Sequence, residues 1–402
     1  MPRWLSIVGL GEDGVDGLSA AARILISGAE IVFGGRRHLS LAAALIRGAA
    51  RPWPSPFDGA PDEVLQHRGR QICVLASGDP FHYGVGAMLA RRIDAREMIV
   101  LPAPSAFSLA AARLGWSLPQ TVLVSVHGRT LDLLRPHLQP GARILALTSD
   151  GEGPRALARL LAQTGFGPSQ LTLLEALGGP KERIRATIAA EFAFDAVDPL
   201  NTVALEVKAG PDARVIARSS GLADDLYEHD GQITKREVRA LTLSSLAPRR
   251  GELLWDIGAG SGSVAIEWML ADPTMRAIAI ERNTERVARI GRNAAAFGVP
   301  GLDIVQGAAP AALARLTAPD AVFIGGGAGD AGVLDAASRA LRAGGRLVVN
   351  AVTLETEALL IARHAAFGGE LIRMAVARAG PVGGKTGWRH ALPITQWVWT
   401  KP

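Results

Sequence analysis

Two glycine-rich loops in the chain could bind a nucleotide, and they differ in spacing. The first, IVGLGEDG at 7–14, places Gly9, Gly11 and Gly14 in the G-x-G-x-x-G pattern of dinucleotide-binding loops. The second, LWDIGAGSGSVAIEW at 254–268, has glycines at alternate positions after an acidic residue. Glycines let the backbone turn tightly and let a ligand approach without Cβ atoms in the way. Each loop is therefore a candidate nucleotide site.

A carboxylate favours the second loop over the first. The apolar run RAIAIE ends in Glu281, 23 residues after Gly258, where its two oxygens can accept hydrogen bonds from both ribose hydroxyls of an adenosine ligand. After the first loop, no acidic residue ends a strand at a comparable distance, because Glu30 precedes its strand, IVFGG. The sequence therefore predicts a nucleoside ligand at the second loop.

Apolar runs that alternate with helical patterns must position these loops. Continuous apolar strands separated by amphipathic helices predict an α/β protein with mostly parallel sheets covered on both faces. Near the end, ELIRMAVARAG and ITQWVWTK have no helical pattern between them, which predicts an antiparallel hairpin with a long connection. Strands are expected at 4–9, 71–77, 98–102, 121–127, 143–149, 170–176, 202–208, 252–257, 276–281, 302–306, 321–325 and 346–352.

A polar seam, RSSGLADDLYEHDGQITKREV at 218–238, separates two complete strand–helix series. It carries no strand pattern, so we place a domain boundary near 210–225. The expected organisation is a first domain over 1–210 with two lobes divided near 116–122, a linker over 211–232, and a second domain over 233–402.

Composition narrows the function classes. The 402 residues are 48% apolar and 20% charged, with one cysteine, so no internal disulfide can form. We expect a cytoplasmic protein without a membrane partner, because no secretory pattern and no long uncharged apolar run is present. The net charge of +5 suits either nucleic acid or a polyanionic small substrate. No aromatic-interleaved basic tract supports nucleic acid, and no H-E-x-x-H or C-x-x-C motif suggests a metal site.

The second loop has the form D-x-G-x-G-x-G, which resembles the first motif of Rossmann-like S-adenosylmethionine (SAM) methyltransferases. DAVFIGGG at 320–327 and LRAGGRLVVNAV at 341–352 resemble the fourth and fifth strands of that superfamily. Many members carry an aspartate after the third strand for the adenine amino group, but Ala308 stands there. The resemblance therefore assigns adenine to backbone groups, and implies SAM contacts at Thr234, Asp256, Gly258, Ala259, Gly260, Ser261, Gly262, Glu281, Ala308 and Ala309.

Three stretches of the first half resemble the tetrapyrrole methylase family, a different, two-lobed SAM fold. They are IVGLGEDGVDGLS (7–19), ASGDPFHYGVG (76–86) and PAPSAFSLAAARLGW (102–116). In that family the opening glycine loop lies at the substrate cleft, so the resemblance implies that 7–14 binds no dinucleotide. It implies SAM contacts at Gly78, Asp79, Pro80, Ser105 and Ala106.

Two methyltransferase folds in one chain, together with VFGGRRHL (32–39) and DGQITKREVRA (230–240), resemble the bifunctional, decarboxylating precorrin methyltransferases of corrin biosynthesis. The resemblance implies two SAM sites, a tetrapyrrole polycarboxylate substrate and a homo-oligomer. It also implies methylation of carbon 5 by the first half, and methylation of carbon 15 with loss of the ring C acetate carboxylate by the second. Whether the substrate carries cobalt stays open, with overall resemblance favouring a metal-free one.

The substrate brings its own nucleophilic carbon, so the protein must supply alignment and desolvation rather than a catalytic triad. The other reading of the polar candidates is a capped helix start, a solvated loop or a packed aromatic ring. Substrate-side candidates are Lys235, Glu237, Arg239, Arg36, Arg37 and His82, with His38, Tyr83, Trp388 and His390 as further neighbours of the two clefts.

Two rival functions are weaker. A methyltransferase that acts on nucleic acid usually carries an [N/D]-P-P-[Y/F] element after its fourth strand, where this chain reads IGGG. A nicotinamide oxidoreductase built on the first loop would lack the acidic residue that binds the ribose.

Overall fold

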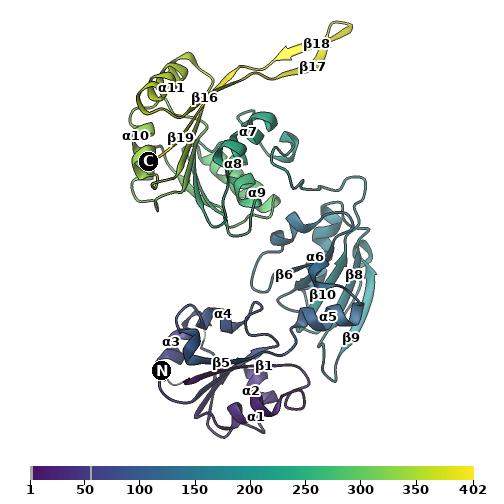
Figure 1. Ribbon diagram of the computed structural model, residues 1–402. Coiled ribbons are helices and arrows are strands. Elements are labelled where there is room, and N and C mark those ends of the chain that lie inside the picture. Colours follow the sequence, from purple (N-terminus) through teal and green to yellow (C-terminus); the bar gives the residue numbers. More distant parts are fainter. Residues whose placement is uncertain (1–2, 55–56) are drawn as a thin grey trace. The chain divides into compact units, whose positions relative to one another are not determined.

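The computed structural model describes residues 3–54 and 57–402, which form two compact units (Figure 1). The first unit comprises residues 1–131 and 137–213, and the second comprises 132–136 and 214–402. Both units combine sheets with covering helices, so the predicted α/β class is confirmed.

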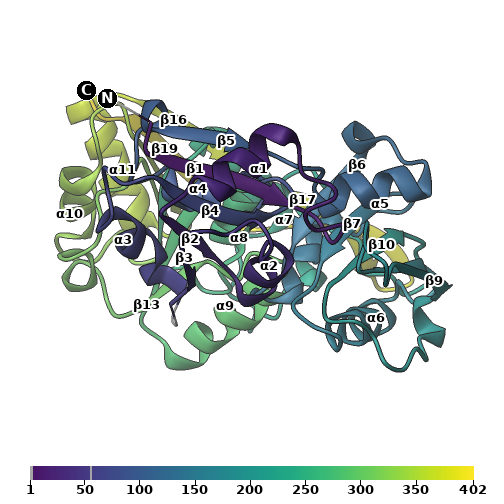
Figure 2. The same ribbon diagram turned by 90° about the horizontal axis from the view of Figure 1, so that it is seen from below.

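The first lobe of the first unit is a parallel five-stranded sheet in the order β3-β2-β4-β1-β5, which Figure 2 shows from below. Residues of β1, β2 and β4 alternate between two apolar clusters, so these strands are buried on both faces as predicted, whereas the edge strand β3 is exposed. Helices α1 and α2 cover one face, and α3 and α4 cover the other (Figure 1). The elements are β1 (Leu5–Leu10), α1 (Ala20–Ser27), β2 (Ile31–Gly34), α2 (Arg36–Leu41), β3 (Ala49–Pro52), α3 (Ala60–Leu65), β4 (Ile72–Ser77), α4 (Val85–Leu89) and β5 (Met98–Leu101).

The second lobe differs from the sequence expectation. Its sheet has the order β6-β7-β10-β8-β9, and only β6 and β7 pair in parallel. The expectation of a mostly parallel sheet is wrong here, because β8 turns directly into the polar strand β9 instead of passing through a crossover helix. The elements are α5 (Ala106–Leu114), β6 (Thr121–Ser125), β7 (Arg143–Leu147), α6 (Gly153–Gln163), β8 (Gln170–Glu175), β9 (Arg183–Ile188) and β10 (Asn201–Glu206).

The second unit contains a seven-stranded sheet in the order β13-β12-β11-β14-β15-β19-β16. The five strands from β13 to β15 run parallel, and β19 runs antiparallel between β15 and β16. Helices α7, α8 and α9 lie on one side of the sheet, and α10 and α11 lie on the other (Figure 1). The elements are α7 (Arg236–Leu246), β11 (Leu253–Ile257), α8 (Ser263–Leu270), β12 (Arg276–Glu281), α9 (Thr284–Ala296), β13 (Asp303–Gln306), β14 (Ala321–Ile324), α10 (Val333–Ala340), β15 (Arg346–Ala351), α11 (Leu354–Phe367), β16 (Glu370–Met374) and β19 (Ile394–Thr400).

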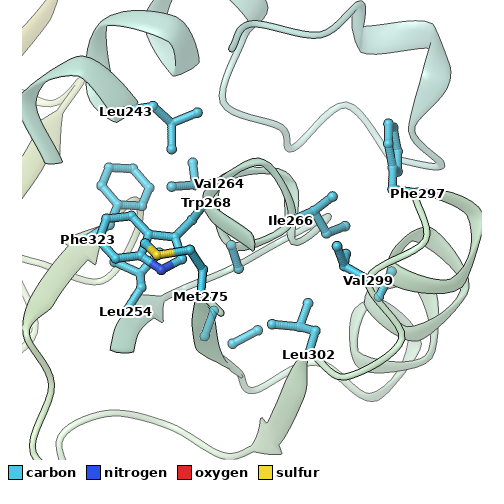
Figure 3. Packing of buried hydrophobic residues seen from close by; sticks show 14 of the residues in the cluster. Leu243, Leu254, Val264, Ile266, Trp268, Met275, Phe297, Val299, Leu302 and Phe323 are labelled. Carbon is cyan, nitrogen blue, oxygen red and sulfur yellow. The ribbon is translucent and has the colours of Figure 1, made fainter. Parts of the chain in front are cut away.

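A large apolar cluster holds α7 and α8 against this sheet. Figure 3 shows Trp268 of α8 among Leu243, Leu254 and Phe323, all of them buried. The Trp268 indole Nε1 also donates a hydrogen bond to the carbonyl oxygen of Arg276 at 3.1 Å, so its one polar atom is satisfied. The cluster thereby holds the start of α8, where the second glycine loop ends.

The carboxy-terminal hairpin forms as predicted between β16 and β19, but its connection is not a plain loop. The connection folds into a second antiparallel ribbon, β17 (Ala377–Val382) and β18 (Lys385–His390). Gly383, with φ of 58°, supplies the left-handed residue that the tight turn requires. In Figure 1 this yellow ribbon extends away from the helices of its own unit.

The segment expected to be a linker, 211–232, is largely part of the second unit. Ile216, Leu222 and Tyr227 are 3–4% exposed and belong to its apolar core. The buried Glu267 carboxylate accepts hydrogen bonds from the Leu222 amide and the Tyr227 hydroxyl, both at 3.0 Å. The sequence of this segment is mostly polar, and its few apolar residues follow neither a helical nor a strand periodicity. Its packing against the second unit could therefore not be predicted from the sequence.

Candidate functional site

A cavity of about 940 Å³ opens in the second unit where the parallel strands end. Residues that follow β11, β12, β13 and β14 line one part of it, and residues of α7, β15 and the β17–β18 ribbon line the rest. Ligands of open α/β sheets bind at the carboxyl ends of the strands, so this is the expected place for one.

The second glycine loop borders this cavity. Gly258 and Gly260 have φ of 71° and 60°, a conformation that glycine adopts at little cost. A Cβ atom on Gly258 would lie 2.7 Å from the carbonyl oxygen of Gly326, whereas one on Gly326 would meet no atom within 4 Å. The loop after β11 and the loop after β14 thus approach closely and leave open space in front.

Glu281 joins the loop to the next strand. Its side chain is 5% exposed, with Oε2 accepting from the Gly260 amide and Oε1 from the Asn283 amide, both at 2.9 Å. Each carboxylate oxygen keeps a further lone pair for a ligand hydroxyl. A ribose diol fits this arrangement, as the sequence predicts.

Asp256 lies behind the loop. It is 1% exposed, and its Oδ2 accepts a hydrogen bond from the Ala265 amide of α8 at 3.1 Å. Burial raises the pKa of Asp256 to about 7, with a smaller contribution from the Glu281 carboxylate, while the Ala265 amide opposes the shift. This geometry suits a residue that orients the loop.

The remaining predicted contacts of the second unit fall into two groups. Ala259, Ala308 and Ala309 line the cavity, beside the amide of Gly307, which donates to the Glu281 carbonyl oxygen at 3.0 Å. Ser261 and Gly262 are not among its lining residues: Ser261 is 1% exposed, and Gly262 caps the amino terminus of α8 with φ of 76°.

The start of α7 contributes Thr234, Lys235 and Glu237 to the cavity wall. Arg239 does not reach it and is fully buried, with Nε 2.6 Å from Glu267 Oε1. Two residues along an α-helix rotate a side chain by about 200°. Arg239 therefore faces the core when Glu237 faces the cavity, and the substrate-side role expected for Arg239 is replaced by a structural one.

The ribbon supplies residues that the sequence did not single out. Arg378 and Arg389 are directly opposite each other in the β17–β18 ladder, and both line the cavity. Glu237 Oε2 lies 2.5 Å from Arg378 Nη2, which ties the ribbon to α7. His390 also lines the cavity, but Trp388 is 71% exposed and is not part of the lining. No regular pattern marked them, because β17 carries one basic residue, Arg378, and β18 carries Lys385, Arg389 and His390 at uneven spacing.

Beside these arginines the cavity wall is apolar. Met374, Val376, Leu392 and Ile394 line it between the ribbon and β15. The cavity thus has a polar end at the glycine loop and an apolar end with arginines at its edge.

In the first unit, the two motifs predicted to hold SAM meet. The carbonyl oxygen of Gly78 accepts from the Ala103 amide at 3.1 Å, and a Cβ on Gly78 would lie 2.9 Å from the Cα of Ser105. Ser105 caps α5 by accepting from the Ser108 amide at 3.1 Å, and Ala106 is the first residue of that helix. Asp79 and Pro80 follow Gly78 in the same loop, where Asp79 Oδ1 accepts from the Phe81 amide at 2.8 Å.

The first glycine loop lacks the geometry of a dinucleotide site. Helix α1 starts at Ala20, six residues after Gly14, so the loop does not lead into a helix amino terminus. The strands beside β1 are β4 and β5, which end in Ser77 and Leu101 and offer no carboxylate for a ribose.

The basic candidates of the first unit form a hydrogen-bonded group. His38 Nε2 lies 2.8 Å from Ser77 Oγ, Arg37 Nη2 donates to the same oxygen at 3.0 Å, and Arg37 also pairs with Glu12 of the opening loop. Burial, together with the Arg37 charge, lowers the pKa of His38 to about 4, so its imidazole is neutral. Arg36, by contrast, is exposed.

The predicted His82 lies among aromatic rings. Its imidazole is stacked with Tyr83 at 5.5 Å and lies 4.8 Å from Phe107. Tyr83, half exposed, donates its hydroxyl to the Leu123 carbonyl oxygen at 3.1 Å. These contacts favour packing over substrate binding as the role of His82.

Two other kinds of site, a membrane span and a metal centre, are absent from residues 3–54 and 57–402. No helix there has the length and apolar character needed to cross a membrane. No group of three or more His, Cys, Asp or Glu side chains there could hold a metal ion.

The fold and the cavity define a SAM-type methyltransferase domain that follows a two-lobed α/β domain. Residues 5–193 match the family model for tetrapyrrole (corrin/porphyrin) methylases, and residues 225–401 match the model for the precorrin methyltransferase domain.

Relatives extend the match over nearly the whole chain. A Sinorhizobium protein named precorrin-6Y C(5,15)-methyltransferase (decarboxylating) is 62% identical over 99% of this chain and 96% of its own length. A Mycobacterium tuberculosis protein of the same name is 42% identical over 98% and 99%. A Salmonella typhimurium protein named cobalt-precorrin-6B C(15)-methyltransferase (decarboxylating) is 38% identical over 33% of this chain and 70% of its own length.

The chain belongs to the precorrin-6Y C(5,15)-methyltransferase (decarboxylating) family, whose members are SAM-dependent methyltransferases. The family identification made from the sequence motifs is therefore confirmed.

Proposed function

We propose that this protein methylates precorrin-6B at carbons 5 and 15 and removes the carboxylate of the ring C acetate, giving precorrin-8x for cobalamin biosynthesis. The observation that carries the proposal is the joining of two methyltransferase folds in one chain, related over nearly its full length to proteins that bear this activity in their name.

We assign carbon-15 methylation and decarboxylation together to the second unit. The name of the Salmonella relative, which matches one third of this chain, unites those two steps in one protein. In the cavity, Glu281 would hold the ribose, the backbone at Gly258 to Gly260 would face the methionine moiety, and Ala308 and Ala309 would flank adenine. Thr234, at the start of α7, would lie near the methionine end.

The chemistry asked of the chain is alignment. Bound SAM supplies an electrophilic methyl group, and the substrate supplies an electron-rich bridge carbon. The apolar wall of Met374, Val376 and Ile394 would exclude water from the ring, which favours methyl transfer from a sulfonium because its charge is dispersed in the transition state. Arg378 and Arg389, with Lys235, would bind the peripheral carboxylates, for which guanidinium groups offer paired donors.

We assign carbon-5 methylation to the first unit, with a second SAM site. Gly78, Asp79 and Pro80 would meet the donor opposite Ser105 and Ala106, whose loops the structure brings into contact. The opening loop at 7–14 would line the substrate cleft, with Arg37 held beside it by Glu12.

The proposal extends to the partners of the protein. We expect a metal-free substrate, because both full-length relatives are named for precorrin-6Y without cobalt. We expect no nucleic-acid substrate, since Gly325, Gly326 and Gly327 occupy the loop that would carry a base-binding motif. A cytoplasmic homo-oligomer completes the proposal, and light scattering of the purified chain would test the oligomer.

Product mass tests the division of labour. Residues 214–402, produced alone because the segment after 213 packs on the second unit, should add one methyl and remove one carboxyl. The mass should then rise by about 14 and fall by about 44 units for one turnover of this aligned chemistry. Residues 1–213 should add one methyl only. Decarboxylation by residues 1–213, or transfer of two methyl groups by residues 214–402, would contradict the assignment.

A further inference from the structure

A neutral amide lines the cavity away from the glycine loop. Asn350, at the carboxyl end of β15, is half-buried and belongs to the cavity wall. Its Nδ2 donates to Thr242 Oγ1 of α7 at 3.0 Å, and its Oδ1 accepts from Gln396 Nε2 of β19 at 2.8 Å. Thr242 and Gln396 are 0% and 1% exposed. Asn350 therefore has a buried polar support of its own.

The supporting bonds define which way the amide points. Gln396 Nε2 donates to Asn350 Oδ1 at 2.8 Å and to Thr242 Oγ1 at 3.3 Å, while Gln396 Oε1 accepts from Ser245 Oγ at 2.7 Å. A flipped Asn350 would set its nitrogen against the Gln396 amide nitrogen and leave buried donors unpaired, which is costly. Counting the bonds of the described residues, one Nδ2 hydrogen and one Oδ1 lone pair of Asn350 stay available to a ligand.

Asn350 is uncharged, unlike several basic residues that line the same cavity. Lys235, Arg378 and Arg389 are cations, which suit carboxylates that stay on the substrate. A carboxylate that leaves as carbon dioxide loses its negative charge to the ring in the transition state. A cation bound to it would stabilise the reactant more than the transition state and slow the reaction. A neutral N–H donor can orient such a group with a smaller penalty.

We propose that Asn350 holds the acetate that the second unit decarboxylates, by donating Nδ2–H to a carboxylate oxygen, with Thr242 and Gln396 as positioning residues. This inference rests on the proposed function. In the step itself, the bond between the acetate methylene and its carboxylate carbon breaks, and the electron pair moves into the conjugated imine system of the substrate. Carbon dioxide leaves, and the methylene takes a proton from water to become a methyl group.

The experiment uses the full chain with SAM and metal-free precorrin-6B, and follows the product by mass spectrometry. In Asn350→Ala, decarboxylation should slow about tenfold or more, as expected for loss of a hydrogen bond to a charged group, while methylation of carbon 15 stays within about twofold. A methylated product that keeps its carboxyl should accumulate. Thr242→Val should act in the same direction, and Thr242→Ser, which keeps the hydroxyl, should behave as the unaltered chain does.

Binding of S-adenosylhomocysteine, measured by calorimetry, shows whether each variant keeps a folded second unit. If Asn350→Ala binds normally but decarboxylates at the usual rate, or loses both reactions in equal measure, the inference is overturned. If Asn350→Ala does not fold, the decarboxylation rates of Thr242→Val and Thr242→Ser test the inference instead. Equal rates for these two variants would exclude the positioning role of Thr242 and overturn the inference. Failure of the proposed function looks different, because the unaltered chain would then neither methylate nor decarboxylate.

Discussion

The two glycine loops of this chain use the same residue for different physical reasons. In the first loop, Gly9 is needed because a Cβ there would lie 1.9 Å from the Gly78 carbonyl oxygen and 2.5 Å from the Ala103 amide. In the second loop, Gly258 and Gly260 have positive φ and turn the chain into α8. At Gly9 the requirement is space alone, whereas at Gly258 a positive φ is added to the close approach of the Gly326 carbonyl oxygen.

Glycine spacing alone therefore does not identify a nucleotide site. The second loop is followed directly by helix α8. It also lies beside a strand that ends in Glu281, whose carboxylate accepts a hydrogen bond from the Gly260 amide. The first loop has neither a helix start nor a carboxylate on an adjacent strand tip. What separates the two is the neighbouring strand in the sheet, which topology determines.

The largest effect should come from crowding the first loop. Gly9→Ala sets a Cβ against backbone atoms that cannot move aside, and we expect it to cost about 3 kcal/mol in the stability of the first unit. Hydrogen exchange of the β1 and β4 amides, read by mass spectrometry, would report this unit alone. Gly59→Ala is the matched control, because Gly59 has an ordinary φ of -74° and a Cβ there would meet only Pro54 at 4.0 Å. Unchanged protection in Gly9→Ala would contradict the role of close approach.

Gly11→Val separates a substrate cleft from a donor site in the first loop. A Cβ on Gly11 would meet only the flexible Asp13 side chain, so the fold should survive. If the loop lines the substrate cleft, methylation of carbon 5 should fall about 100-fold through substrate misplacement. The measured affinity of the first unit for S-adenosylhomocysteine should stay the same. Loss of that affinity in folded protein would restore the loop as a nucleotide site.

Glu281→Ala tests the second loop in turn. Removing the carboxylate that accepts from Gly260 and that we assign to the ribose should weaken S-adenosylhomocysteine binding to the second unit at least about tenfold. Glu285→Ala, an exposed change in the first turn of α9, is the control and should bind as the unaltered chain does. Calorimetry on the full chain should show one weakened and one unaltered site. Two unaltered sites would remove Glu281 from the donor site.

The smallest expected effect is a difference in pH dependence between the two loop regions. Burial raises the pKa of Asp256 from 3.8 to about 7, so the folded second unit holds this proton more tightly than the unfolded chain. Its stability should therefore fall as the pH rises from about 4 to 7, and stay lower above. The asparagine in Asp256→Asn cannot ionise. The Tm of this variant minus the Tm of the unaltered chain should therefore increase by about 3 °C between pH 5 and 8.

His38 beside the first loop should show the opposite sign. Its pKa is lowered from 6.5 to about 4 by burial and by Arg37, so the unfolded chain binds the proton more tightly. The stability contributed by neutral His38 is present above pH 6.5 and is lost as the pH falls toward 4. Hydrogen exchange of β2 and β4 across that range would test this. A first unit that gains protection on acidification would contradict it.

Much of the molecule was determined by the sequence alone. Apolar runs marked β1, β4, β11, β12, β14 and β15, because a strand buried on both faces must be largely apolar. The spacing from Gly258 to Glu281 predicted a carboxylate beside the loop, because adjacent parallel strands end at the same edge of a sheet. Gly78 and Ser105, which the sequence motifs assigned to one donor site, lie close together in the first unit.

Other features were decided only by tertiary contacts between distant residues. Arg239 looked like a cavity residue until Glu267, 28 positions later, paired with it in the core. Arg378 and Arg389 line the cavity together only because β17 and β18 pair and place them opposite each other. Asn350 reads as part of an apolar strand, and only its bonds to Thr242 and Gln396, 108 and 46 positions away, give it a defined orientation. A sequence pattern records the face that a residue prefers, whereas its partners across the core depend on how the whole chain packs.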